Sequence, residues 1–120
     1  MERKTLGDLG EQLAKDYLKK KGYKLVETNY RCHSGEIDIV AKHKDCLVFV
    51  EVRTKSTLEY GAPEESLSPT KQKHMKKCAY YYLQRLKTLP KNWRIDLVAV
   101  ELDLSGVLQR IEILENILEE

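Results

Sequence analysis

The sequence predicts a single α/β domain in which helices flank a central, mixed sheet. Two stretches have apolar residues at three- and four-residue steps, which indicates helices, and five shorter stretches are apolar or alternating, which indicates strands. Their order along the chain is α-β-β-β-α-β-β. With 120 residues, of which 42% are hydrophobic, residues 1–120 are expected to form one domain with one core and one site.

The first half of the chain contains one expected helix and three expected strands. The helix covers residues 3–21, and its apolar positions are Leu6, Leu9, Leu13 and Tyr17. Gly22 ends it, because glycine adopts the left-handed conformation at a helix end at little cost. The strands cover residues 23–30, 37–41 and 47–54. A short polar turn separates the last two, so we expect them to form a hairpin.

The second half contains the other helix and two more strands. Ser68 and Pro69 are the residue types preferred at an N-cap and at the first helical position, so the helix is expected to start there. Its apolar stripe consists of Met75, Cys78, Ala79, Tyr82 and Leu86. Residues 95–100 and 107–114 are the expected strands, around a turn that contains Ser105 and Gly106. We therefore expect a five-stranded sheet.

The formal net charge is only +2, but the charge is unevenly distributed. Residues 66–95 contain no Asp or Glu, whereas the basic residues there are Lys71, Lys73, Lys76, Lys77, Arg85, Lys87, Lys91 and Arg94. Such a block is typical of a surface that contacts phosphates. It is equally compatible with a solvated helix face whose charge is balanced elsewhere in the fold.

Cysteine usage and hydropathy indicate the compartment. Cys32, Cys46 and Cys78 are an odd and scattered set, which does not indicate a disulfide framework. The first twenty residues are too charged for a signal peptide. No apolar run approaches the roughly 20 residues needed to cross a bilayer. We therefore expect a soluble protein of the reducing cytoplasm, with no membrane contact.

The apolar residues of the expected hairpin restrict its register. If Asp38 lies opposite Glu51, one face consists of Ile37, Ile39, Ala41, Val48, Val50 and Val52. Pairing Glu36 with Glu51 instead keeps this apolar face. A slip by one residue would turn carboxylates into the core, which is costly. Two registers therefore remain open.

Both registers gather charged residues on the other face of the hairpin: Glu36, Asp38, Glu51, Arg53 and Lys55. Neighbouring carboxylates repel each other. Mg²⁺ takes oxygen ligands, commonly one or two carboxylates, and would offset the repulsion. The spacing alone leaves a second interpretation open, in which Arg53 and Lys55 neutralise the carboxylates on a solvated face.

Several motifs resemble a known family. Asp38 followed by Glu51-Val52-Arg53 resembles the catalytic signature of the PD-(D/E)xK nuclease superfamily. Over nearly the whole chain, the segments GDLGEQLAKDYLKKKGY, GEIDIV, VFVEVRTKS, SPTKQK and RIDLVAV resemble, in this order, the YraN-like family of uncharacterised bacterial proteins. That family is similar to archaeal Holliday junction resolvases. The resemblance implies the restriction-endonuclease-like fold, with a helix on each side of a mixed sheet.

The resemblance also implies a metal site for Mg²⁺ or Mn²⁺. The implied ligands are Asp38, Glu51 and the backbone carbonyl of Val52. Glu11 matches an acidic position that completes such sites in the resolvase-like branch. Arg53 stands where the superfamily usually has lysine, and arginine stays charged and is a poor base. We expect Arg53 to orient water or to stabilise charge on phosphate, and Lys55, on the same strand face, is the candidate substitute.

The activity implied is metal-dependent endonucleolytic hydrolysis of DNA, including branched or structured DNA, by a chain that could form a homodimer as junction-cleaving relatives do. The expected contacts to the nucleic-acid backbone are Lys71, Lys73, Lys76 and Lys77. Gln72 matches a glutamine that points toward the metal site in related nucleases. Two alternatives stay open: a catalytically inactive nucleic-acid-binding module with the same fold, which Arg53 favours, and a protein-interaction domain.

Further residues carry weaker signals. Asp96 recurs in the family pattern, either as a catalytic group or as a partner of Arg94. In the run of three tyrosines, Tyr82 is expected in the core, while Tyr80 or Tyr81 either stacks on a base or packs on the surface. The connection over residues 56–67 is long, and is either a flap over the site or a plain loop.

Overall fold

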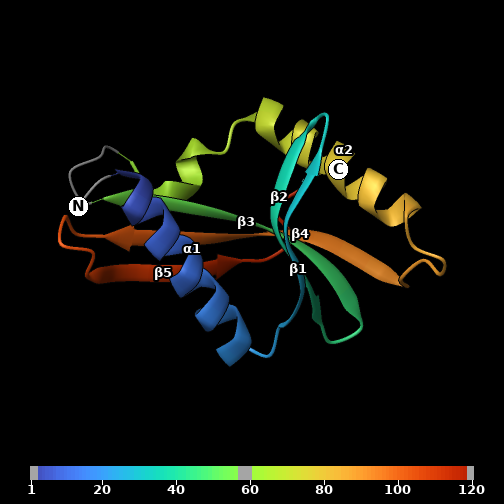
Figure 1. The fold of residues 1–120 in the computed structure, drawn as a ribbon, viewed down its shortest axis with the longest axis horizontal. Helices are drawn as coiled ribbons and strands as arrows, with labels where there is room; N and C mark the ends of the chain where they lie inside the picture. The colour runs from blue at the N-terminus through green and yellow to red at the C-terminus, as the bar shows by residue number, and fades with distance from the viewer. Residues whose placement is uncertain (1–2, 57–60, 119–120) are drawn as a thin grey trace.

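The structure is a computed structural model that describes residues 3–56 and 61–118, and it confirms the predicted order of elements (Figure 1). Helix α1 spans Arg3–Lys20 and helix α2 spans Pro69–Gln84. The strands are β1 (Lys24–Cys32), β2 (Gly35–His43), β3 (Cys46–Ser56), β4 (Asn92–Leu102) and β5 (Leu108–Leu114). Each predicted element is present, within a few residues of its expected ends.

The connection from β3 to α2 contains a short 3₁₀ helix, η1 (Pro63–Ser66), where the sequence predicted only a long connection. Arg110 of β5 holds it in place, because the guanidinium forms an ion pair with Glu64 at 2.7 Å. Residues 57–60, which belong to the connection expected to be a flap or a plain loop, lie outside the described residues. The described part of this connection contributes Ser66 to the site described below.

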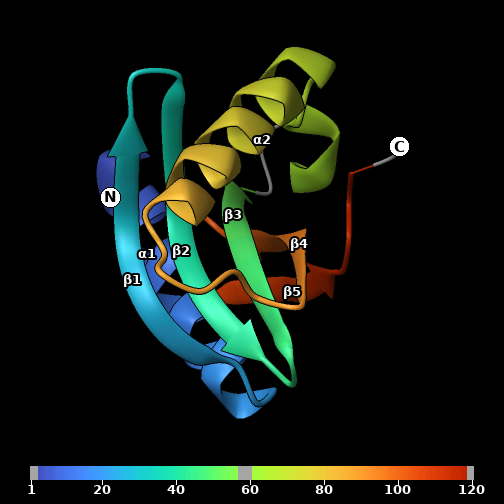
Figure 2. The same ribbon diagram turned by 90° about the vertical axis from the view of Figure 1, so that its right-hand side faces the viewer.

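The five strands form one sheet in the order β1-β2-β3-β4-β5. Neighbouring strands are antiparallel except β3 and β4, which are parallel, so the sheet is mixed as predicted. A parallel pair needs a crossover connection, and here α2 provides it. Figure 2 shows α2 in front of β2 and β3 on one face of the sheet, while α1 lies on the other face.

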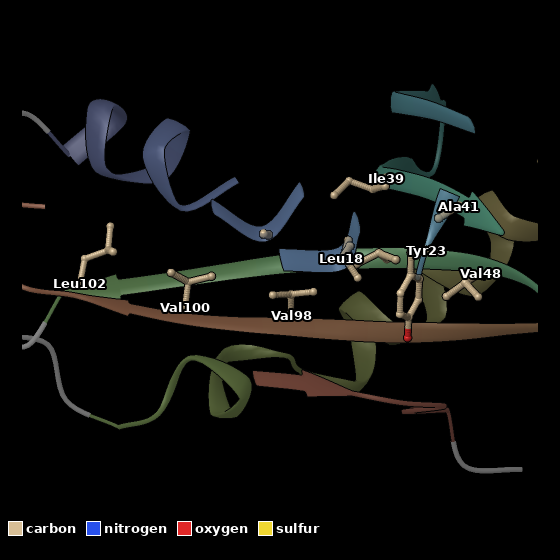
Figure 3. Close-up of a cluster of buried hydrophobic side chains, with 10 residues drawn as sticks. Leu18, Tyr23, Ile39, Ala41, Val48, Val98, Val100 and Leu102 are labelled. Carbon is tan, nitrogen blue, oxygen red and sulfur yellow. The ribbon is translucent and has the colours of Figure 1, made fainter. Parts of the chain in front are cut away.

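Each face of the sheet is covered by one helix. On the α1 face, Leu18 packs into a cluster of aliphatic side chains that includes Ile39, Val50 and Val98 (Figure 3). On the α2 face, Phe49 and Ile95 pack against the stripe predicted for this helix, of which Met75, Cys78, Ala79 and Tyr82 are buried. The central strands are therefore buried on both sides, which is typical of sheets that contain a parallel crossover.

The register of the β2–β3 hairpin is the first of the two that the sequence allowed. Ile39 lies opposite Val50 and Ala41 lies opposite Val48, so continuing this register brings Asp38 to Glu51. The expectation that Ile37 shares a face with Ile39 is wrong. Ile39 is in the cluster under α1, whereas Ile37 is in the cluster under α2. Because side chains two residues apart in a regular strand share a face, β2 must rotate between them.

Cys32 and Cys78 form a disulfide that joins the end of β1 to α2, which corrects the expectation that the cysteines are unpaired. They are 46 residues apart in sequence, but the fold brings their Cα atoms to 6.0 Å. The inference of a reducing compartment rested on unpaired cysteines and loses that support. In the described ranges, none of the helices has the length and hydropathy that crossing a bilayer requires.

Candidate metal and nucleic-acid site

The site begins where β2 separates from β3. Backbone pairing of the hairpin extends from the turn as far as Ile39 and Val50 and then stops. One residue further, the side chain of Asp38 replaces the backbone as partner, because its Oδ2 accepts a hydrogen bond from the Val52 N–H at 2.8 Å. This is the point at which β2 rotates. The sheet therefore opens at Asp38, beside the exposed backbone edge of β3.

Val52 presents a second oxygen to this opening. The N–H and C=O of a strand residue point to the same side of the strand. Because the Val52 N–H points to Asp38, its carbonyl also points toward the space that β2 has left. The backbone oxygen predicted as a metal ligand thus lies on the same side of β3 as the carboxylate of Asp38.

Glu51 contacts Asp38 directly. The two carboxyl groups share a hydrogen bond, and the Glu51 side chain is only 14% exposed. Burial, followed by the hydrogen bond and negative charge of Asp38, raises the pKa of Glu51 to about 9, although Arg53 and Lys71 act in the opposite direction. In the absence of a cation, a proton is therefore retained between these two carboxylates.

Arg53 and Glu11 carry the buried polar atoms that lack a hydrogen bond. Among the described residues, these side-chain atoms are Nε and Nη2 of Arg53 and Oε1 of Glu11. Arg53 Nη2 is 3.4 Å from Glu51 Oε2, and Glu11 Oε1 is 4.0 Å from Lys15 Nζ, so both form ion pairs without hydrogen-bond geometry. Buried polar groups nearly always have hydrogen-bond partners. Their concentration here indicates a site that binds a further polar or charged group.

Glu11 reaches the site because α1 lies very close to β3. A Cβ atom added to Gly10 would be 2.0 Å from Thr54 Oγ1, so only glycine permits this contact. The next residue is Glu11, whose pKa is raised by burial and then by the negative charge of Asp38. The helix thus supplies a third carboxylate from the opposite face of the sheet.

Two hollows meet at Asp38, Val52 and Arg53, which line both. The first, of about 410 Å³, extends toward α2 and is also lined by Gly35, Glu36, Glu51, Lys71, His74 and Met75. The second, of about 330 Å³, extends toward α1 and η1 and is also lined by Gly7, Glu11, Thr54, Lys55 and Ser66. Together they form a groove with carboxylates at its centre and cationic side chains along it.

Most of the predicted site residues line this groove: Glu11, Glu36, Asp38, Glu51, Val52, Arg53, Lys55 and Lys71. Gln72 is placed differently, since its amide donates to the carbonyl of Leu67 at 3.5 Å, in the turn before α2. Glu36 pairs with Arg31 at 3.3 Å. The other predicted lysines, Lys73, Lys76 and Lys77, lie further along α2.

His74 and Ser66 also line the groove, although neither was predicted as a site residue. His74 lies three residues after Lys71 on α2, so helical spacing could have placed it beside that lysine. No spacing pattern in the sequence indicated Ser66, because its position is set by η1, which was not predicted.

The donor set fits a cation that needs few protein ligands. The described residues hold no cluster of three or more His, Cys, Asp or Glu side chains arranged to bind a metal ion. Asp38 and Glu51 are in contact, however, and the Val52 carbonyl faces the same opening. Mg²⁺ commonly uses one or two carboxylates and takes its other oxygens from water and substrate phosphates. The residues present therefore fit Mg²⁺ or Mn²⁺ better than a fully protein-coordinated ion.

Asp96 belongs to a separate network. It is fully buried and accepts hydrogen bonds from the Tyr23 hydroxyl at 2.8 Å, Arg94 Nε at 2.9 Å and the Asn116 N–H at 2.9 Å. The predicted pairing with Arg94 is thus confirmed. Asp96 lines neither hollow of the groove. Through its bond with Asn116, Asp96 of β4 holds the segment after β5 against β4.

The comparisons with known proteins identify the family. The sequence model of the "Uncharacterised protein family UPF0102" matches residues 10–100, which include Glu11, Asp38, Glu51 and Arg53. This chain belongs to the UPF0102 family. A UPF0102 protein of Caldicellulosiruptor saccharolyticus is 40% identical over 116 residues, which is 97% of this chain and 98% of that protein.

Other UPF0102 proteins match over a similar extent. The one from Dehalococcoides mccartyi is 46% identical over 118 residues, 98% of this chain and 96% of its own. The one from Syntrophus aciditrophicus is 43% identical over 113 residues, 94% and 87% respectively. The UPF0102 match thus includes both helices and the strands that form the groove.

Proposed function

We propose that this protein is a divalent-metal-dependent endonuclease that hydrolyses phosphodiester bonds of DNA, including branched or structured DNA. It would be a YraN-like member of the PD-(D/E)xK superfamily, with the restriction-endonuclease-like fold and similarity to archaeal Holliday junction resolvases. The observation that carries the proposal is the contact between Asp38 and Glu51 at the opening of the sheet. The buried guanidinium of Arg53 lies beside them.

The metal ligands in this proposal are Asp38, Glu51 and the carbonyl of Val52, with Glu11 completing the acidic set. When bound, Mg²⁺ or Mn²⁺ would polarise the scissile phosphate and lower the pKa of an attacking water. Asp38 and Glu51 retain a proton between them without a cation, and coordination requires both to ionise. Metal affinity is therefore expected to rise with pH, with release of about one proton.

The basic residues have different roles in this proposal. The unsatisfied Nε and Nη2 of Arg53 suit a phosphate oxygen, because a guanidinium binds phosphate through two parallel N–H donors. Arg53 stays protonated and does not act as a base. Lys55 lies two residues along the same strand, about 7 Å away, and is the residue proposed for proton transfer. Lys71 is exposed at the edge of the groove and contacts the DNA backbone.

The second candidate function is a catalytically inactive nucleic-acid-binding module with the same fold. The observation in its favour is Arg53, which removes the lysine that usually assists proton transfer in the superfamily. For either function we propose DNA as the partner, a homodimer and a cytoplasmic location. In that compartment the Cys32–Cys78 pair is expected to be reduced.

The test is cleavage of labelled single-stranded, duplex, flap and four-way-junction DNA in Mg²⁺ or Mn²⁺. We expect metal-dependent cleavage that is lost in Asp38→Asn and Glu51→Gln. Asp45→Asn is the matched control, because this exposed carboxylate lies in the turn at the other end of the same hairpin. Cleavage that persists in either site variant would refute the proposed site. Binding without cleavage, with activity gained in Arg53→Lys, would establish the inactive module.

A further inference from the structure

A third hollow lies further along α2, outside the groove. Its volume is about 310 Å³, and it is lined by His33, Ser34, Lys77, Tyr80, Tyr81 and Gln84. It lies between the turn that joins β1 to β2 and the side of α2 that faces away from the sheet. Tyr80 is 47% exposed and Tyr81 is 39% exposed, which is unusual for two adjacent large aromatic side chains.

Both rings are fixed in place although they are exposed. The hydroxyl of Tyr81 is hydrogen-bonded to His33 Nε2 at 3.1 Å, and the two rings meet edge to face with centroids 4.9 Å apart. The ring of Tyr80 meets Trp93 in the same manner at 5.5 Å. Edge-to-face contacts hold a ring without covering both of its faces. The hollow therefore presents ordered aromatic surface to the solvent.

The charge of the hollow selects an anionic occupant. Residues 66–95, which include all of α2, contain no Asp or Glu. Lys77 lines the hollow, and Lys73 is exposed one turn before it. The neutral side chains of Ser34 and Gln84 can both donate and accept hydrogen bonds. Exposed aromatic rings, a cation and neutral polar groups together match the π-face, phosphate and polar edge of a nucleotide.

On two elements, the residues that line the hollow are close in sequence to residues that line the groove. Ser34 lines the hollow, and the next two residues, Gly35 and Glu36, line the groove beside Asp38. On α2, Lys77 lines the hollow and His74, three residues earlier, lines the groove. Three residues correspond to about 4.5 Å along a helix axis. A strand whose phosphate lies at Asp38 and Glu51 therefore has a neighbouring nucleotide within reach of the hollow.

The geometry points to a binding site for an unpaired nucleotide, whose base stacks on Tyr80 or Tyr81 and whose phosphate contacts Lys77. The inference rests on the proposed nuclease function and specifies its substrate class. Bases in continuous duplex are stacked on one another, and extracting one costs a few kcal/mol. The protein should therefore prefer DNA with a single-stranded segment beside the cut, such as a flap, over an uninterrupted duplex.

The experiment measures binding of a fluorescent oligothymidine and of a blunt duplex by anisotropy, in EDTA so that no cleavage occurs. Tyr80→Leu, Tyr81→Leu or both should weaken oligothymidine binding about 5- to 150-fold, the range for loss of one stacked base, and leave duplex binding unchanged. Tyr81→Phe keeps the ring but loses the bond to His33, and it should weaken binding less than Tyr81→Leu does. Tyr17→Leu, on α1, is the matched control. Trp93, the single tryptophan, should change its emission when the oligonucleotide binds, because it contacts Tyr80.

Four results would overturn the inference: wild-type affinity in both leucine variants, equal weakening in Tyr81→Phe and Tyr81→Leu, equal weakening in Tyr17→Leu, or no binding of oligothymidine by the wild type. Thermal melting of each variant shows whether lost binding reflects lost folding. The nuclease proposal fails separately. If the wild type cleaves no DNA in metal but loses oligothymidine binding in the leucine variants, the nucleotide site stands and the endonuclease does not.

Discussion

Replacing Glu51 by glutamine should stabilise the metal-free protein at neutral and alkaline pH. The pKa of this carboxyl is raised from 4.5 to about 9, first by burial and then by Asp38. Between these two values the folded protein keeps a proton that the unfolded chain releases. The free energy of unfolding therefore falls as pH rises through this window. A glutamine amide does not ionise and can still donate a hydrogen bond to Asp38.

The size of the effect follows from the environment of the carboxyl group. Each unit of pKa corresponds to 1.36 kcal/mol, which sets an upper limit of about 6 kcal/mol at pH 9. This pKa already includes the opposing charge of Arg53, whose Nη2 is 3.4 Å from Glu51 Oε2. At pH 7, which is 2.5 units above the ordinary value of 4.5, we expect about 3 kcal/mol. For a chain of this size, that corresponds to an increase in Tm of about 6–12 °C.

The assay is thermal unfolding in EDTA, followed by circular dichroism from pH 5 to pH 9. Wild type and Glu51→Gln should have similar Tm values near pH 5 and diverge as the pH rises, while Asp45→Asn should follow the wild type. Taking the difference between wild type and variant removes the contribution of the titrating groups that do not interact with Glu51. Equal Tm differences at pH 5 and pH 9 would show that Glu51 ionises normally, and would refute the reasoning.

Three further perturbations test the fold around the site. Gly10→Ala should cost about 1–3 kcal/mol and reduce cleavage, since the new Cβ meets Thr54 at 2.0 Å, whereas Gly7→Ala has open space and should stabilise the helix by about 0.5–1 kcal/mol in the same melting assay. Asp96→Asn should lower the free energy of urea unfolding by about 3–5 kcal/mol, because it leaves the Arg94 charge without its buried partner; an unchanged midpoint would contradict this. Reducing the disulfide between β1 and α2 should cost about 2–4 kcal/mol for the loop it closes, measured as a Tm decrease in dithiothreitol.

The sequence predicts most reliably what depends on neighbouring residues. The apolar residues Ile39, Ala41, Val48 and Val50 exclude a slip of the hairpin by one residue, and they leave two registers, one of which the structure has. The helical stripe of α2 is predicted for the same reason, since its spacing follows from 3.6 residues per turn. Such patterns are local consequences of backbone geometry.

Features that depend on distant segments were not predictable in the same way. Ile37 continues the alternation of the hairpin, so nothing in the pattern indicates that the strand rotates at Asp38 and sends Ile37 to the other face. The contact of Gly10 with Thr54 and the pairing of Cys32 with Cys78 depend on how the helices pack on the sheet. Their residue types gave no spacing signal.

The hydrogen bond from the Val52 N–H to Asp38 also affects how site variants should be designed. The carboxylate keeps β2 and β3 apart, because it accepts the hydrogen bond that the Val52 N–H would otherwise donate to the backbone of β2. An alanine at this position would leave the Val52 N–H without this acceptor. Backbone pairing between β2 and β3 would then extend by another residue pair and narrow the groove. Asp38→Ala would therefore combine a lost ligand with a changed sheet. Asn keeps an oxygen that accepts this hydrogen bond. The Asp38→Asn variant therefore removes the charged metal ligand without changing how β2 and β3 separate.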